Sequence, residues 1–233
     1  MGRVVTATLK SLGVEYADGE VVEIQRQGSR ISGVGLGDGT RLSCGELVNA
    51  AGAAAARLAQ LAGVDDLPVH PRKRMVYTFQ CRQPVPDAPL VIDPTGVWFR
   101  PEGDRFLAGV SPPADHDPDC LDLEIDYALF DDIVWPALAH RVPAFDAIKR
   151  GNCWAGHYAV NVRDHNAIVG AHPEVENLWF ANGFSGHGVQ QSPAVGRAIS
   201  ELITYGQFRT LDLTRFAFER FAAGALIEET NVI

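Results

Sequence analysis

Residues 178–203, which read LWFANGFSGHGVQQSPAVGRAISELI, constrain the fold more than any other stretch of the chain. The first four residues are apolar and predict a short buried strand, and three glycines follow within residues 183–188. A helical pattern runs on from Pro193, because proline fits the first turn of a helix. Glycines let a backbone approach a ligand closely, and a helix start presents unpaired N–H groups. The stretch therefore predicts a site for an electron-rich or anionic ligand group.

The charge and hydropathy patterning of the chain exclude two kinds of partner. The 233 residues carry a formal net charge of −9, whereas nucleic acid requires a basic face, so we expect no nucleic-acid binding. No apolar run approaches the roughly 20 residues that span a bilayer, so we expect no membrane span. The first residues lack the apolar core of a secretory signal, which predicts a cytoplasmic protein.

The cysteines predict reduced thiols and no metal site. They lie tens of residues apart, and no pair has the spacing of zinc ligands. The four are Cys44, Cys81, Cys120 and Cys153.

Residues 3–46 predict one helix and a meander of short strands. Residues 3–12 have helical character, and Gly13 is typical of a left-handed helix end. Strands are expected at residues 14–16, 21–24, 34–36 and 41–42, with turn residues between them. The glycines within residues 33–39 have no buried strand before them and no helix after them. We therefore interpret them as a hairpin turn and not as a phosphate-binding loop.

Residues 47–52 predict a second corner between a strand and a helix. The apolar start is followed by Ala50, Ala51 and Gly52, and an alanine-rich helix is expected over residues 53–62. Small side chains here allow a ligand to lie against the backbone. A tightly packed structural corner is the alternative interpretation.

The middle of the chain has the pattern of an antiparallel sheet. Strands are expected at residues 75–81, 90–92, 97–100 and 105–109, with proline-rich links between them. A helix is predicted over residues 122–140, bent or ended early by Pro136. Residues 153–158 predict a strand that enters a loop at Gly156. The phenylalanine-rich tail, residues 209–233, predicts a helix packed on the core.

Three segments stand out when they are taken together: residues 48–52 (VNAAG), residues 98–101 (WFRP) with 107–109 (LAG), and residues 182–188 (NGFSGHG). Together they resemble the FAD-dependent oxidoreductases of the D-amino-acid oxidase and sarcosine oxidase type. From residue 153 onward the chain is most similar to the FAD-dependent oxidoreductase domain-containing branch. The resemblance implies an α/β (α+β) fold. It divides the chain into an incomplete FAD-binding domain, residues 1–70 and 151–233, and an inserted, mostly antiparallel substrate domain, residues 71–150.

The resemblance also implies a non-covalent FAD and assigns residues to it. Val21 would contact the adenine, and Ala50, Ala51 and Gly52 would lie near the ribose and pyrophosphate. The loop along the pyrimidine edge of the flavin would consist of Gly183, Phe184, Ser185, Gly186, His187, Gly188, Val189 and Gln190. A reduced flavin carries negative charge on that edge, which backbone N–H groups and a helix dipole stabilise.

The reaction implied by the resemblance is oxidation of a C–N bond in a small-molecule amine or amino acid, with hydride passing to FAD. His187 and His157 are the candidate catalytic residues. His187 would polarise the flavin or contact the substrate, and a structural histidine is its alternative interpretation. Substrate-binding roles fall to Trp98, Arg100 and Tyr158.

The substrate carboxylate has no obvious partner in this sequence. Some relatives hold it with a lysine where this chain has Gln190, and others with an arginine where it has Trp154. Arg100 could pair with a carboxylate in bidentate fashion, and a surface strand residue is the equal alternative.

The sequence departs from the family at its start. Family members begin with a strand and a G-x-G-x-x-G turn that bind the FAD pyrophosphate, and nothing before Val48 has that form. We expect that this first half is missing, either through truncation or because a second chain supplies it. The isolated chain is then expected to bind FAD weakly or not at all. The alternative function is a non-catalytic remnant or subunit that acts through a partner protein, as an assembly factor does.

Two rival chemistries are not favoured. A serine-hydrolase elbow needs glycine two residues after the serine, and His187 occupies that place after Ser185. Covalent flavin attachment at Cys153 is also not expected, because the spacing to Asp164 is longer than in relatives that use a cysteine.

Overall fold

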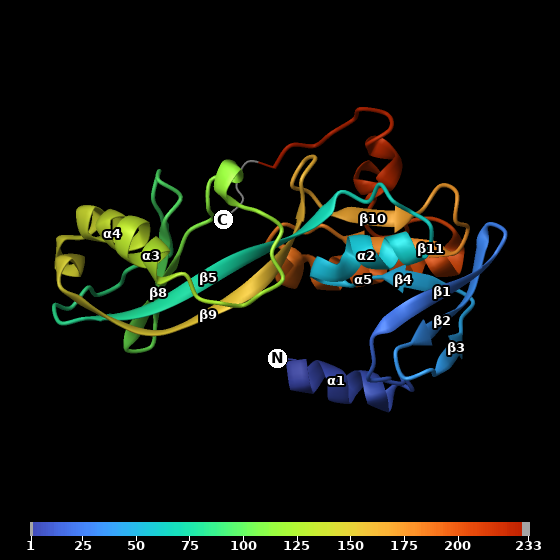
Figure 1. Cartoon of the computed structure of the whole chain (residues 1–233), viewed down its shortest axis with the longest axis horizontal. Coiled ribbons are helices and arrows are strands. Elements are labelled where there is room, and N and C mark those ends of the chain that lie inside the picture. Colours follow the sequence, from blue (N-terminus) through green and yellow to red (C-terminus); the bar gives the residue numbers. More distant parts are fainter. Residues whose placement is uncertain (1, 230–233) are drawn as a thin grey trace.

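The computed structural model describes residues 2–229, except for the side chains of residues 2–6 and 114. Figure 1 shows an elongated molecule in which two long strands, β5 (Val69–Cys81) and β9 (Ile148–Asn161), run side by side along much of its length. An antiparallel sheet with a helical layer lies at one end, and a layered α/β region lies at the other. This mixture of helices and sheets confirms the predicted fold class.

The antiparallel sheet has five strands in the order β6-β7-β8-β5-β9. Its shorter members are β6 (Val91–Ile92), β7 (Trp98–Glu102) and β8 (Arg105–Gly109), and every pair of neighbours is antiparallel, as predicted. Alternation along β5 places Tyr77 and Phe79 on the covered face, where both are fully buried with Phe145. The opposite face of β5 and β9 is left to line a pocket.

Helical residues cover the Tyr77 face of this sheet, but the predicted helix over residues 122–140 is wrong at its start. Asp126 caps α3 (Tyr127–Leu129) by accepting the Leu129 N–H at 3.1 Å, and residues 122–125 before it are not helical. A π-helical segment, η3 (Phe130–Val134), precedes α4 (Trp135–Arg141). Pro136 lies in the first turn of α4, directly after the π-helical segment, and the helical run continues past it to Arg141. The 3-10 turns η2 (Ala114–His116) and η4 (Pro143–Asp146) flank this layer.

The second sheet has the order β10-β11-β4 and lies between two helices. β11 (Leu178–Asn182) pairs antiparallel with β10 (Ile168–Ala171) and parallel with β4 (Leu47–Asn49). Leu178 and Phe180 face the core that contains α2 (Ala55–Leu61), which follows the turn η1 (Gly52–Ala54). Trp179 and Ala181 face the other way, toward α5 (Gly188–Tyr205). Both predicted strand-to-helix corners are confirmed.

The helix predicted within residues 178–203 is α5, and it begins at Gly188 and not at Pro193 as predicted. Pro193 lies inside the helix, where it cannot donate to the carbonyl of Val189. The hydroxyl of Ser192 donates to that carbonyl at 2.9 Å, which compensates for the missing bond. The helix ends at Gly206, whose φ of 69° is left-handed.

The predicted meander is confirmed by a third sheet of β1 (Val21–Gln27), β2 (Arg30–Leu36) and β3 (Arg41–Ser43), in that order. This sheet follows α1 (Gly2–Ser11). Gly13, two residues after the helix, has a left-handed φ of 88°. The strand predicted at residues 14–16 is absent from the described structure. Val14 and Tyr16 are exposed there, and no described sheet edge pairs with them.

Two further predictions are corrected in the last third of the chain. Gly156 lies within β9, paired opposite Arg74, and does not start a loop. The described tail contains only the 3-10 turns η5 (Thr214–Phe216) and η6 (Phe218–Arg220) instead of a helix, although Phe218 is buried in the core. Short turns suffice because the polar network described below fixes this segment. Residues 230–233 of the predicted tail lie outside the described residues.

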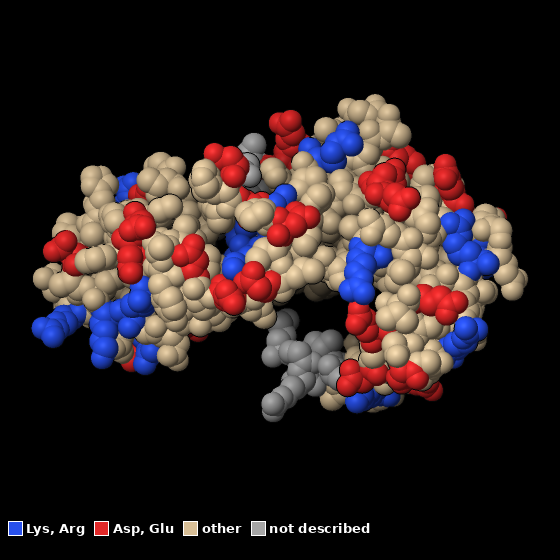
Figure 2. All heavy atoms as spheres, in the orientation of Figure 1, with Lys and Arg blue, Asp and Glu red and all other residues tan. Residues whose placement is uncertain are grey.

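The surface carries charges of both signs. Figure 2 shows Asp and Glu distributed over the whole visible face, with a small group of Lys and Arg side chains at the far end of the antiparallel sheet. Within residues 2–229, no helix is long and apolar enough to cross a membrane.

Candidate functional site

A hollow of about 380 Å³ lies where the two predicted strand-to-helix corners meet. Most of its wall residues are small or apolar, among them Ala50 and Gly52 from the corner after β4, and Gly183, Phe184 and Gly188 from the glycine loop. The first turns of α5 form another wall. The sequence placed these five residues at one ligand, and the structure brings them together.

The glycine loop, residues 183–188, is fixed from behind by β9. The N–H of Ser185 donates to the carbonyl of Ala159 at 3.1 Å, and the N–H of Asn161 donates to the Ser185 hydroxyl at 3.1 Å. Ser185 is 1% exposed and has a φ of 49°, and its hydroxyl donates to the carbonyl of Gly183 at 3.2 Å, so its side chain holds the loop together. The loop is therefore a preorganised element and not a flexible connector.

Gly186 lies directly against the ring of Tyr158. A methyl group added at Gly186 would lie 2.6 Å from the Tyr158 ring, and φ at this residue is 102°. Glycine is required here for both conformation and space. This contact joins the loop to the antiparallel sheet.

A second, smaller pocket of about 160 Å³, called the aromatic pocket below, lies on the open face of the antiparallel sheet. Aromatic side chains from β7 and β9, namely Trp98, Trp154 and Tyr158, form its walls with Arg74 of β5. His157 also borders it, but its Nε2 lies 3.2 Å from the backbone carbonyl of Asp122. Because Tyr158 touches Gly186, this pocket adjoins the glycine loop.

Arg74 is the residue of this pocket that the sequence reasoning missed. Its Nη1 and Nη2 donate to the two carboxylate oxygens of Asp117 at 2.7 and 2.8 Å, and its guanidinium carbon lies 5.6 Å from the Tyr158 ring centroid. Its Nε is buried without a hydrogen-bond partner among the described residues. The signal in the sequence was strand alternation, which separates Arg74 from Lys73 within the basic run.

Several predicted site residues lie outside both hollows. Gln190 and Val189 are exposed on α5, and Val189 is 81% exposed. Arg100 pairs with Glu102 on its own strand and does not reach the aromatic pocket. The remaining predicted residues that line neither hollow are Val21, on β1 beside the core, Ala51, Ser185 and Gly186 of the glycine loop, and His187, the N-cap residue of α5.

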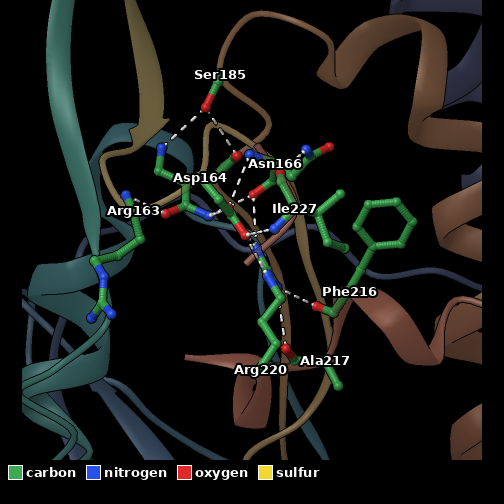
Figure 3. A network of polar contacts seen from close by, with 10 residues as sticks. Arg163, Asp164, Asn166, Ser185, Phe216, Ala217, Arg220 and Ile227 are labelled. Atoms are coloured by element: carbon green, nitrogen blue, oxygen red, sulfur yellow. Dashed lines mark hydrogen bonds and ion pairs between the residues drawn. The ribbon is translucent and has the colours of Figure 1, made fainter. Parts of the chain in front are cut away.

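Figure 3 shows the polar network that supports the loop from the side of the tail. Arg220 donates to both carboxylate oxygens of Asp164, and Asn161 donates to Asp164 Oδ1 at 2.6 Å. Burial acts to raise the pKa of Asp164, but the hydrogen bond from Arg220 and those from backbone N–H groups hold it below its usual value. The tail, the 161–166 turn and the glycine loop thus share one buried ion pair.

Comparison with known proteins identifies the family of the chain. A family model described as FAD dependent oxidoreductase, DAO, matches residues 3–202. FAD-dependent oxidoreductase domain-containing protein 1 of Xenopus laevis is 46% identical over 205 residues, which are 82% of this chain and 41% of the relative. The homolog of Drosophila melanogaster is 40% identical over 211 residues, 84% of this chain and 40% of the relative. The chain thus spans about two-fifths of the length of these curated relatives.

Solved structures share the fold. L-proline dehydrogenase from P. horikoshii superposes with a TM-score of 0.82 and 27% identity, covering 94% of this chain and 58% of that one. Glycine oxidase from Geobacillus kaustophilus gives a TM-score of 0.74 and 25% identity, covering 88% and 53%. The chain therefore belongs to the family of FAD-dependent oxidoreductases of the D-amino-acid oxidase type, DAO.

Proposed function

We propose that this chain forms the substrate-facing part of a flavoenzyme that oxidises a C–N bond in an amine or amino acid. When bound, FAD supplies the redox chemistry by accepting a hydride from the substrate. The chain's own residues bind and orient the two reactants and exclude water. Residues 71–150 are proposed as the substrate domain, and residues 1–70 and 151–233 as part of the FAD-binding domain.

The residues of the hollow between the two strand-to-helix corners, called the flavin hollow below, fit a non-covalent flavin. Ala50, Gly52, Gly183 and Gly188 leave backbone accessible to a flat ring, and the start of α5 offers N–H groups to its electron-rich edge. The family's covalent alternative does not fit, because Cys153 packs against the core of the antiparallel sheet. Burial also raises the pKa of the Cys153 thiol, which makes it a poor nucleophile.

One observation carries the substrate side of the proposal. Tyr158, which lines the aromatic pocket, lies against Gly186 of the glycine loop, and Gly183, Phe184 and Gly188 of the same loop line the flavin hollow. A small molecule in the aromatic pocket would therefore lie next to a ring held by the glycine loop. That neighbourhood is what hydride transfer between the two requires.

The walls of the aromatic pocket suit an amine that carries a carboxylate. Trp98, Trp154 and Tyr158 present π faces that attract an ammonium group and keep water out. Arg74 has an Nε–H without a partner and can donate it to a substrate carboxylate. Two structural relatives carry the names L-proline dehydrogenase and glycine oxidase, which supports an amino-acid substrate here.

A dinucleotide-binding half completes the proposed enzyme, whether it belongs to the same polypeptide or to a second chain. The relatives of Xenopus and Drosophila are more than twice as long as the matched region. Among the described strands, β4 pairs only with β11, so its other edge is available for a further parallel strand.

The proposed function is tested by flavin bleaching. The chain, loaded with FAD alone or together with a dinucleotide-binding half, is mixed anaerobically with glycine, sarcosine, L-proline and a simple amine. We expect the flavin absorbance to bleach with at least one of them and to return when air is admitted. A flavin-loaded preparation that none of these compounds bleaches would contradict C–N oxidation, whereas a colourless, stable chain would favour the non-catalytic alternative.

A further inference from the structure

Asn182, the last residue of β11, has a buried side-chain amide with no partner among residues 2–229. The residue is 1% exposed, and neither its Oδ1 nor its Nδ2 makes a hydrogen bond within the described structure. Asn182 is one of the residues that border the flavin hollow, and both of its amide atoms are covered from solvent. Asn182 is not among the residues that the sequence analysis assigns to the cofactor.

The other buried asparagines of the described chain show how unusual this is. Asn177 donates to the carbonyls of Ile31 and Gly45 and accepts the Ile31 N–H at 2.8 Å. Asn49 donates to the carbonyl of Ala55 at 2.9 Å and accepts the Ala51 N–H. Asn161 likewise uses both of its side-chain atoms. These three side chains stabilise the fold through hydrogen bonds, whereas the Asn182 side chain makes none within the described residues.

A buried amide without partners destabilises the folded chain, because it has lost its hydrogen bonds to water and gained none. An apolar residue would fill this place at the end of β11 without that penalty. The side-chain amide of Asn182 therefore destabilises the folded chain whenever no ligand pairs with it. Such a group is expected where a ligand provides the missing partners.

We propose that Asn182 is a flavin-binding residue that pairs, through both its N–H and its carbonyl oxygen, with the flavin half of FAD. This inference rests on the flavin part of the proposed function and is independent of the substrate. It adds a side-chain contact to a site otherwise made of backbone and small residues, and makes Asn182 a determinant of cofactor specificity.

The chemistry of the amide selects the part of the cofactor. An amide needs one acceptor and one donor, and a diphosphate at neutral pH offers acceptors alone. The hydroxyl groups of the ribityl chain and the imide edge of the flavin ring each offer both. With either partner, the ribityl hydroxyl groups or the imide edge, the adenine diphosphate makes no contact with Asn182. Binding of flavins with and without the ribityl chain distinguishes the two partners.

The first experiment measures the thermal midpoint of the FAD-free chain. Asn182→Leu removes the unpaired amide at similar volume and is expected to raise the midpoint by about 2–4 °C. The matched control, Asn177→Leu, removes a fully paired buried amide far from the hollow and is expected to lower it by at least as much. If both variants lower the midpoint equally, Asn182 is a structural residue and the inference is overturned.

The second experiment measures binding by flavin fluorescence and thermal shift, with FAD, riboflavin, lumiflavin and ADP each titrated to saturation or to millimolar concentration. Asn182→Ala is used here, because a smaller side chain cannot block the hollow. We expect roughly tenfold weaker binding of FAD and riboflavin, and unchanged binding of ADP. Weaker lumiflavin binding as well would locate the contact at the ring, and unchanged lumiflavin binding would locate it at the ribityl chain.

The outcomes separate this inference from the proposed function. FAD binding that Asn182→Ala leaves unchanged overturns the inference and leaves the proposed function intact. A wild-type chain that binds none of the flavins, even with a dinucleotide-binding half added, overturns both. Flavin binding that depends on Asn182, without bleaching by any amine, supports the inference and contradicts only the proposed substrate class.

Discussion

The Nε of Arg220 lies 2.7 Å from Oδ2 of Asp164, and both side chains are withdrawn from solvent, at 4% and 0% exposure. The pair joins a segment near the end of the chain to the turn that supports the glycine loop, because Asn161 bonds both to Asp164 and to Ser185. A residue with no contact to the flavin hollow thus helps to set the position of the loop that lines it (Figure 3).

Replacing Arg220 with methionine is expected to cost about 3–5 kcal/mol of unfolding free energy, because it leaves the Asp164 carboxylate buried and unpaired. Arg163→Met is the matched control. Arg163 is exposed and makes a ring contact with Phe221, so its loss is expected to cost less than about 1 kcal/mol. Urea unfolding of the two variants measures the difference, and equal losses would show that the ion pair is not a stabilising element.

The same pair predicts a dependence on acid. The folded-state pKa of Asp164 lies below its ordinary value of 3.8, so its stabilising contribution is present above that value and is lost as pH falls through the folded pKa. In Arg220→Met, burial without the guanidinium is expected to raise this pKa instead. The stability gap between wild type and variant should therefore narrow as pH is lowered from about 6 toward 3. A gap that stays constant over this range would contradict the assignment.

His172 predicts a second pH dependence, closer to neutrality. Burial lowers its pKa, and its Nδ1 accepts the N–H groups of Glu174 and Val175 at 3.1 and 3.0 Å, which only an unprotonated nitrogen can do. The unfolded chain takes up this proton first, so stability is full above the ordinary value of 6.5 and falls as pH drops below it. His172→Asn keeps an acceptor at this turn and cannot titrate, so the slope of stability between about pH 7 and 5 should flatten.

Gly186 is predicted to tolerate no side chain. Gly186→Ala forces a methyl group into the Tyr158 ring and strains a φ of 102°, so we expect a loss of about 1–3 kcal/mol. Gly196, within α5, has open space around its added methyl, and Gly196→Ala is expected to gain about 0.5–1 kcal/mol. Combining Gly186→Ala with Tyr158→Ala should restore the steric part of the loss. A Gly186→Ala variant as stable as wild type would show that Tyr158 is free to move.

The elements that the sequence predicts well are those set by local pattern. The corners at residues 47–52 and 178–188 combine apolar strands with small residues, and both form as predicted. The start of α5 was misplaced because a proline is compatible with two positions, and only the Ser192 hydrogen bond decides between them. The π-helical turn in η3 and the irregular tail depend on tertiary contacts, which no local pattern encodes.

The candidate site shows the same division. Glycines and alanines mark the hollow proposed for the flavin, because small residues are visible in the sequence. The buried polar atoms without a partner among the described residues, namely both amide atoms of Asn182 and the Nε of Arg74, become visible only in the structure. Arg100, selected as a cation on a substrate strand, is instead satisfied by Glu102 two residues away.

Arg74, and not Arg100, is therefore predicted to bind the substrate carboxylate. Arg74→Lys keeps the charge but loses the Nε–H that is proposed to donate to the substrate carboxylate, and we expect KM for an amino-acid substrate to rise roughly 10- to 100-fold with little change in kcat. For an amine without a carboxylate, KM should stay the same, because the lost contact is specific to that group. Arg100→Lys is the control and should leave both constants unchanged. Steady-state kinetics of the flavin-loaded enzyme with the two substrate classes provides the measurement. A KM that rises with Arg100→Lys instead would assign the carboxylate to β7.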